Sequence, residues 1–260
     1  MWRQGRGWGE NIRDSPDFSG PYTAGQMSFK ALILAAGRGE RMRPLTDHTP
    51  KPLLQVGGRP LVAWHLEALA RAGVREVVIN TAWLEEQFEP ALGDGRDWGL
   101  KIRWSHEGRD HGGALETAGG IAKALPWLGE VFWVVSGDVF LPGFAFDSAA
   151  AQAFAQSPNL AHLWLVPNPA HHPRGDFALE ASGQLQRAHP ANETHRLTWA
   201  SVGLFKASMF AHLQVGTACA LRPLLDAACD QGRLSGERWD GAWTDVGTPE
   251  RLEALRRRCE

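Results

Sequence analysis

The chain has 260 residues and is 43% apolar, which is enough for one large α/β domain or two small ones with a sizeable core. Its formal net charge of −2 does not favour a nucleic-acid partner, and no apolar run approaches the roughly 18 residues of a membrane span. The three cysteines contain no Cys-x-x-Cys pair. We therefore expect reduced thiols in a cytoplasmic protein and neither disulfides nor a zinc site.

Residues 1–26 differ in composition from the rest of the chain. They are rich in glycine and lack the apolar segment of a secretory signal. We predict a disordered leader here, followed by a folded part over residues 27–260. The alternative is an interaction tail that uses Trp2 and Trp8.

The first predicted strand, residues 29–35, ends in a turn of small residues. An apolar run with β-branched Ile33 favours a buried strand, and Gly37 and Gly39 follow it directly. Glycines let the backbone approach a bulky anion, and the next N–H groups can point at phosphate oxygens.

A cluster of positive charge follows this turn, in Arg38, Arg41, Arg43 and Lys51. Lys51 stands between two prolines, so we expect it in a stiff, extended segment and not in a helix. Together the glycines and the basic residues predict a polyphosphate-binding loop. A glycine-rich turn with no ligand is the alternative.

Two common phosphate-binding motifs are excluded. The G-x-x-x-x-G-K-[ST] loop is absent. A dinucleotide fingerprint requires a third glycine where this chain has Met42, and a carboxylate about 20 residues further on, where none stands near Gly57 and Gly58.

Strand and helix patterns alternate through the first half of the chain. Further strands are predicted at 75–80, 101–104 and 131–135, and helices at 60–72, 84–92 and 116–125. This order predicts a Rossmann-like α/β fold, with a mostly parallel sheet flanked by helices. Ligands bind beyond the carboxyl ends of such strands, so we expect Gly37, Asn80 and Asp138 at one edge of the sheet.

The second half, from about residue 141, has shorter strand patterns. Strands are predicted at 160–166, 176–180, 184–188 and 197–205, and helices at 219–231 and 249–258. We expect a smaller antiparallel subdomain here.

Asp138 and Asp245 each stand between an apolar segment and a turn. A buried carboxylate is costly unless it meets a cation or several donors. Two such carboxylates and a phosphate would suit Mg²⁺, which prefers oxygen ligands. Cap or turn residues are the alternative for each aspartate taken alone.

Residues 34–42 (LAAGRGERM) and 49–53 (TPKPL) resemble the signature of the sugar-1-phosphate nucleotidyltransferases. The resemblance continues through 115–120, 136–139 and 243–248, and covers about residues 29–250. It implies a nucleotide-binding half at about 27–140 and a sugar-side half at about 141–260.

The reaction implied by the resemblance is attack of a sugar 1-phosphate oxygen on the α-phosphorus of a nucleoside triphosphate, with loss of pyrophosphate. A phosphate monoester has its second pKa near 6, so the nucleophile is largely dianionic at neutral pH and needs no general base. The enzyme must hold two anions in line and offset the developing charge.

The resemblance assigns roles to particular residues. It implies that Arg41 and Lys51 are catalytic cations and that Mg²⁺ binds to Asp138 and Asp245. The implied nucleotide-binding residues are Ala36, Gly37, Gly39, Glu40, Arg41, Lys51, Asn80, Glu116 and Gly119. The implied sugar-binding residues are Asn168, Arg174, Asp176 and Gly203. For the segment 116–120, Thr117 as a helix N-cap is an equal alternative.

Residues 168–177 (NPAHHPRGDF) and 235–237 (SGE) resemble one subgroup, the N-acetylmuramate α-1-phosphate uridylyltransferases. The expected substrates are UTP and that sugar 1-phosphate, for peptidoglycan recycling by a monomer. The alternatives are a guanylyl- or thymidylyltransferase for mannose or glucose 1-phosphate, and a catalytically silent regulatory relative.

Two features near the expected site depart from the family pattern. Ser136 replaces the usual asparagine, and the 108–114 segment is longer than usual. Adjacent His171 and His172 would point in opposite directions in an extended segment, which argues against one shared metal ion.

Overall fold

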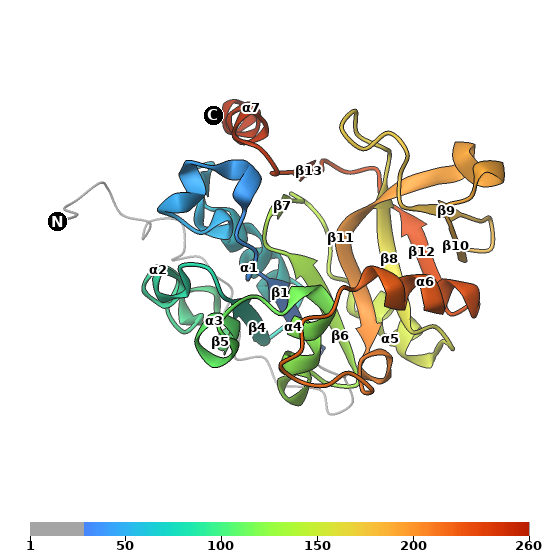
Figure 1. Ribbon diagram of the computed structural model, residues 1–260, viewed down its shortest axis with the longest axis horizontal. Coiled ribbons are helices and arrows are strands. Elements are labelled where there is room, and N and C mark those ends of the chain that lie inside the picture. Colours follow the sequence, from blue (N-terminus) through green and yellow to red (C-terminus); the bar gives the residue numbers. More distant parts are fainter. Residues whose placement is uncertain (1–28, 260) are drawn as a thin grey trace.

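The computed structural model describes residues 29–259, so the predicted leader and the alternative tail lie outside the described part. Its centre is a nine-stranded sheet with helices on both faces (Figure 1). The strand order is β10-β9-β11-β6-β1-β4-β5, and β8 pairs with both β11 and β12.

One half of this sheet is parallel, as predicted. It contains β1 (Lys30–Leu34), β4 (Glu76–Thr81), β5 (Lys101–His106) and β6 (Val131–Ser136). Leu34 pairs with Asn80 on one side and Ser136 on the other. The predicted strand ends therefore do meet at one edge.

The antiparallel strands continue the same sheet. They are β8 (Ala161–Val166), β9 (Phe177–Leu179), β10 (Leu185–Arg187) and β11 (Arg196–Lys206). β11 joins the two halves, because it pairs antiparallel with both β6 and β8. β12 (Leu234–Arg238) is a strand that the pattern did not predict, and it runs parallel to β8.

Helices cover the two faces according to the side-chain alternation of the strands. α1 (Leu61–Arg71) and α5 (Ser148–Gln156) share a core with Ala31 and Ile33 of β1. α4 (Glu116–Ala124) and α6 (Arg222–Asp230) share the opposite core with Leu32. The predicted 84–92 helix is a 3₁₀ turn (Glu85–Gln87) followed by α2 (Phe88–Leu92), and α3 (Glu107–His111) follows β5.

The C-terminal helix α7 (Pro249–Arg258) lies beside the segment that follows the glycine turn (Figure 1). A third core cluster joins them, made of Met42, Leu54, Val56, Leu61, Phe140, Val246, Leu252 and Leu255. Two short ribbons, β2 (Gln55–Val56) with β3 (Arg59–Pro60) and β7 (Val139–Phe140) with β13 (Thr244–Asp245), complete this region. In the described part of the chain, no helix is long and apolar enough to cross a bilayer.

Candidate active site

The phosphate loop, defined here as residues 37–51, leaves its backbone open near the two glycines. Gly39 has a φ of +67°, and a Cβ atom there would lie 3.0 Å from the methyl group of Thr46. The Thr46 hydroxyl donates to the Gly39 carbonyl at 2.8 Å and holds this conformation. Gly37 is exposed, and apart from its chain neighbours no described residue has a heavy atom within 4 Å of the place a Cβ would take. Glycine is therefore required at 39, and the loop backbone at 37 is accessible to a ligand.

Two of the four cations in this loop hold its shape. Arg38 donates to the Thr46 carbonyl and to Asp47, and its guanidinium lies 3.6 Å from the centre of the Trp83 ring. The hydrogen bond from Arg38 holds the pKa of the Asp47 carboxyl below its ordinary value. Arg43 lies 3.3 Å from the same carboxylate. Arg41, by contrast, is exposed and has no ion-pair partner among the described residues.

Lys51 begins a 3₁₀ turn, Lys51–Leu53, so the prediction of an extended segment was wrong. Pro52 fits this turn because its fixed φ suits a helical start and it has no N–H to lose there. The proline ring packs against Gly137, where a Cβ would lie 3.3 Å from it. This contact brings the Lys51 ammonium within 2.6 Å of Asp138 Oδ2, with Lys51 only 7% exposed.

Asp138 and Asp245 lie on two adjacent segments, as their predicted roles require. Asp245 pairs with Val139 in the β7–β13 ribbon, and the Val246 amide donates to the Asp138 carbonyl at 3.1 Å. Asp245 Oδ2 accepts from Arg251 at 2.8 Å and lies 3.4 Å from His171 Nε2. Each aspartate keeps Oδ1 without a hydrogen-bond partner in the described part of the chain.

Asn80 lies at the same edge but below its surface. It is 2% exposed, accepts from the Ala35 amide at 2.8 Å and donates to Glu107 at 2.7 Å. Ala36, the next residue of the β1 exit, is also buried.

At α4, the amides of Ala118 and Gly119 donate to the carbonyl of Cys219 at 2.9 and 3.1 Å. The N-cap of α4 is Leu115 and no side chain caps the helix, so the alternative in which Thr117 is the cap was wrong. Glu116 is exposed, with a φ of +56°, and so is Glu40 of the phosphate loop.

The sugar-side loop, defined here as residues 168–176, is held by its own polar side chains. Asn168 donates to the Arg196 carbonyl and accepts from the Thr198 hydroxyl, at 3.0 and 2.9 Å. Asp176 accepts from the Trp199 amide at 2.9 Å. Arg174 is exposed and has no bonding partner among the residues the structure describes.

The two histidines of this loop face different partners, although the segment is a turn and not the extended stretch on which the prediction rested. His171 lies beside Arg251 and Asp245, whereas His172 lies 3.2 Å from Asp176. His171 therefore connects the sugar-side loop to β13, whereas His172 makes a contact within the loop.

A family model for nucleotidyl transferases matches residues 30–259. The chain belongs to the nucleotidyl transferase family. It is 50% identical over 226 residues to the N-acetylmuramate alpha-1-phosphate uridylyltransferase of Neisseria meningitidis, covering 86% of this chain and 95% of that protein. The Caulobacter vibrioides protein of the same name is 34% identical over 231 residues, covering 85% and 92%.

The fold of this nucleotidyl transferase also matches solved structures. A Bacillus anthracis protein described as a putative glucose-1-phosphate thymidylyltransferase superimposes with a TM-score of 0.74 at 20% identity, over 89% of this chain and 95% of that one. The predicted family and fold class are thus confirmed.

Sequence patterns missed His65, on α1 behind the site of this nucleotidyl transferase. The ring is buried, and burial lowers its pKa from 6.5 to about 4. Nε2 lies 2.9 Å from the Val139 carbonyl, which only accepts, so the neutral ring donates to it. His65 thereby holds the residue next to Asp138. A histidine on the apolar face of a predicted helix was the available signal.

Ser201 was also missed. It lies in β11 at a bulge between Trp199 and Gly203 and has a φ of +61°, which is unfavourable for serine. Two indole groups satisfy the bulge, from Trp199 to the Val202 carbonyl and from Trp243 to the Ala200 carbonyl. Gly203 follows inside the sheet, where a Cβ would lie 2.8 Å from the His162 carbonyl. The bulge faces the end of β6, so the strain lies at the edge that carries the site.

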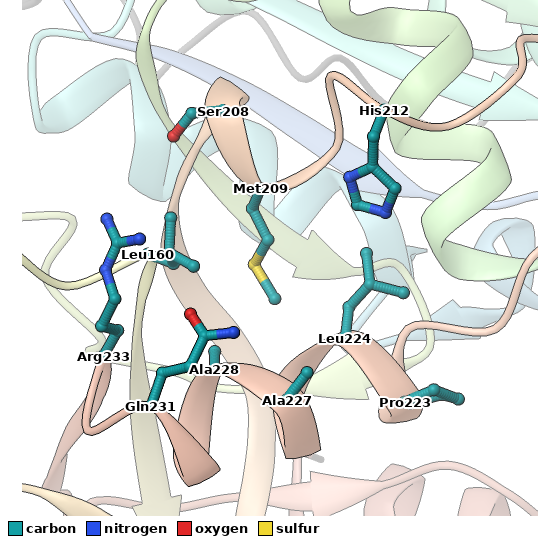
Figure 2. Close-up of a pocket in the computed structure, with 10 residues that line it drawn as sticks. All are labelled: Leu160, Ser208, Met209, His212, Pro223, Leu224, Ala227, Ala228, Gln231 and Arg233. Atoms are coloured by element: carbon teal, nitrogen blue, oxygen red, sulfur yellow. The ribbon is translucent and has the colours of Figure 1, made fainter.

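A separate pocket of about 430 Å³ lies where β11 ends, between α6 and the turn Ala207–Met209 (Figure 2). Met209 and Leu224 point into it. None of the predicted site residues lines it. Since β11 runs antiparallel to β6, this pocket lies at the sheet edge opposite the phosphate loop.

Proposed function

We propose that this chain transfers a uridylyl group from UTP to N-acetylmuramic acid 1-phosphate, giving UDP-N-acetylmuramic acid and pyrophosphate for peptidoglycan recycling. The observation that carries the proposal is the 50% identity to the Neisseria meningitidis relative of that name over 95% of its length. The enzyme would act as a monomer in the cytoplasm. Its three cysteines are free thiols, in keeping with that compartment.

The site geometry supports this reaction class. The nucleophile is already dianionic, so the residues need only to bind, align and offset charge. In the proposal, the triphosphate binds to the open backbone at Gly37 and to Arg41, which has no ion-pair partner within the described residues 29–259. Lys51 stabilises the charge that develops as pyrophosphate leaves.

The two aspartates fit a divalent metal ion of the hard, oxygen-binding kind. They stand on neighbouring segments and have cations against their Oδ2 atoms, and each offers an Oδ1 that no described residue bonds. Mg²⁺ is therefore the ion we propose at Asp138 and Asp245, where it would offset phosphate charge when bound.

Substrate choice depends on the sugar side. N-acetylmuramic acid carries a lactyl ether with a carboxylate, which N-acetylglucosamine lacks. Asn168 and Asp176 bond to β11, and His172 lies against Asp176, whereas Arg174 has no partner among the described residues and can meet an anion. We assign the carboxylate contact to Arg174, with Asn168, Asp176 and Gly203 shaping the pocket.

A matrix of sugar 1-phosphates against the four nucleoside triphosphates, followed by pyrophosphate release, tests the proposal. N-acetylmuramic acid 1-phosphate with UTP should give the highest kcat/KM. If mannose 1-phosphate with GTP proved best, the substrate assignment would be wrong and the family would stand. Absence of turnover with every pair would instead favour the regulatory relative.

A further inference from the structure

Three buried hydrogen bonds connect Ala35, which lies between β1 and the phosphate loop, to the start of α4. The Ala35 amide donates to Asn80 Oδ1 at 2.8 Å, and Asn80 Nδ2 donates to Glu107 Oε1 at 2.7 Å. The Leu115 amide then donates to Glu107 Oε2 at 2.7 Å. Asn80 is 2% exposed and Glu107 is fully buried. The connection therefore spans the ends of β1, β4 and β5 out of reach of solvent.

The neighbours of each atom in this connection fix it as either a hydrogen-bond donor or an acceptor. A backbone N–H only donates, so Asn80 turns its oxygen to Ala35 and its amide nitrogen to Glu107. The Leu115 amide takes the second oxygen, so residue 107 must present two acceptors. Burial raises the pKa of Glu107, but both donors and the charge of Lys123 favour the carboxylate.

The surrounding backbone leaves this connection no room to shift. A Cβ at Gly120 would lie 2.5 Å from Glu107 Oε1 and 2.7 Å from Asn80 Nδ2. A Cβ at Gly108 would lie 2.6 Å from the Ala82 carbonyl. Glycine at these two positions allows α3 and α4 to pack this closely, so a displaced side chain would move a whole element.

We propose that Asn80 and Glu107 are positioning residues for the nucleotide, which set the spacing between the phosphate loop and the first turn of α4. The inference rests on the proposed function in taking the nucleotide to lie between these two segments. None of the three bonds involves the sugar-side loop. The pair should therefore act on nucleotide affinity and leave sugar phosphate affinity unchanged.

A charge-conserving exchange tests this role. Asn80→Asp alone sets two carboxylates against each other, and Glu107→Gln alone turns an amide nitrogen toward a donor. Combining N80D with E107Q reverses the middle bond and keeps all three, because the new carboxylate accepts twice and the new amide donates once and accepts once. The total charge equals that of the wild type.

Each single variant should raise the KM for UTP about tenfold or more, with the KM for the sugar phosphate within about twofold of the wild type. The double variant should return the UTP value to within about threefold. Ser105→Ala is the matched control, since this buried hydroxyl at the end of β5 has no hydrogen-bond partner in the described part of the chain. Its KM values should not change.

A double variant that is no better than the worse single variant, or that fails to fold, would overturn the proposal. So would single variants that lower only the melting temperature. The affinity for UTP, measured by calorimetry without sugar phosphate, allows the same comparison between the wild type, the single variants and the double variant. If the wild type turned over no sugar phosphate at all, the proposed function would fail while this cycle would still give its answer.

Discussion

The phosphate loop and the sugar-side loop each combine engaged polar side chains with one exposed arginine, but the engaged side chains find their partners in different places. In the phosphate loop, Arg38 and Arg43 share Asp47, while Arg41 remains exposed beside an open backbone. In the sugar-side loop, Asn168 and Asp176 both bond to β11, and Arg174 is exposed with no partner among the described residues.

This difference in where the partners come from determines how much the sequence alone can say about the role of a polar residue. Glycine spacing in the phosphate loop acts on the local backbone, so its meaning is visible in the chain itself. In the sugar-side loop, Asn168 and Asp176 take their partners from a distant strand, and these bonds maintain the shape of the loop. Variants on the two sides should therefore differ in kind, with activity lost on one and selectivity or stability on the other.

The largest effect is expected at the two aspartates. Asp138→Asn and Asp245→Asn should each reduce kcat on the order of 1,000-fold or more, because each would remove a ligand of the proposed metal ion. The circular dichroism spectrum should stay unchanged, since both side chains are partly exposed. Magnesium titration decides the assignment: a wild-type optimum in either variant would remove that aspartate from the site.

Lys51→Ala should slow kcat on the order of 100- to 1,000-fold, since loss of one preorganised charge acts mainly in the transition state. The KM for the sugar phosphate should change little. Arg43→Ala is the matched control from the same loop, because its exposed guanidinium pairs with Asp47, whereas the buried Lys51 ammonium pairs with Asp138 of the expected site. A Lys51 variant that lost only sugar affinity would show that the lysine belongs to the other side of the site.

On the sugar side, Arg174→Ala should cost about ten- to a hundredfold in the preference for N-acetylmuramic over N-acetylglucosamine 1-phosphate. Both kcat/KM values give this ratio. Asn168→Ala should instead lower the melting temperature, because it removes bonds to Thr198 and Arg196. Equal effects of the two variants on selectivity would contradict the distinction between a free and an engaged side chain.

The free energy of unfolding should depend on pH through His65, whose ring bonds to the carbonyl of Val139, next to Asp138. Its pKa is about 4 in the folded protein, against the ordinary 6.5 of an exposed histidine in the unfolded chain, so protonation favours unfolding. The contribution is complete above pH 6.5 and falls as the pH drops toward 4. At pH 4.5 the loss should be on the order of 2 to 3 kcal/mol. Urea unfolding at pH 7 and 4.5 measures it, with His65→Gln as the non-titrating reference; equal losses in both proteins would contradict the assignment.

Removal of residues 1–26 should have the smallest effect. A chain starting at Met27 should match the full chain in melting temperature and in kcat/KM, since the first 26 residues contain little that could add to the core. A drop in either quantity would add a third region to the comparison and favour the interaction tail.

The sequence by itself determined the family, the α/β order and the convergence of three strand ends on one edge. These depend on features within a few residues: glycines that open a turn, apolar runs that form buried strands, and a parallel order that places carboxyl ends together. Gly39 illustrates this, because its left-handed backbone is required locally.

Only the tertiary structure decided which polar groups are free and which are engaged. Lys51 meets Asp138 across 87 residues, and Asn80 meets Glu107 across 27. Such pairs depend on strand register and on the close approach of backbones, as at Gly120 and Gly137. The energy of a buried polar group depends on its partner, and that partner exists only when the sheet and its helices have packed.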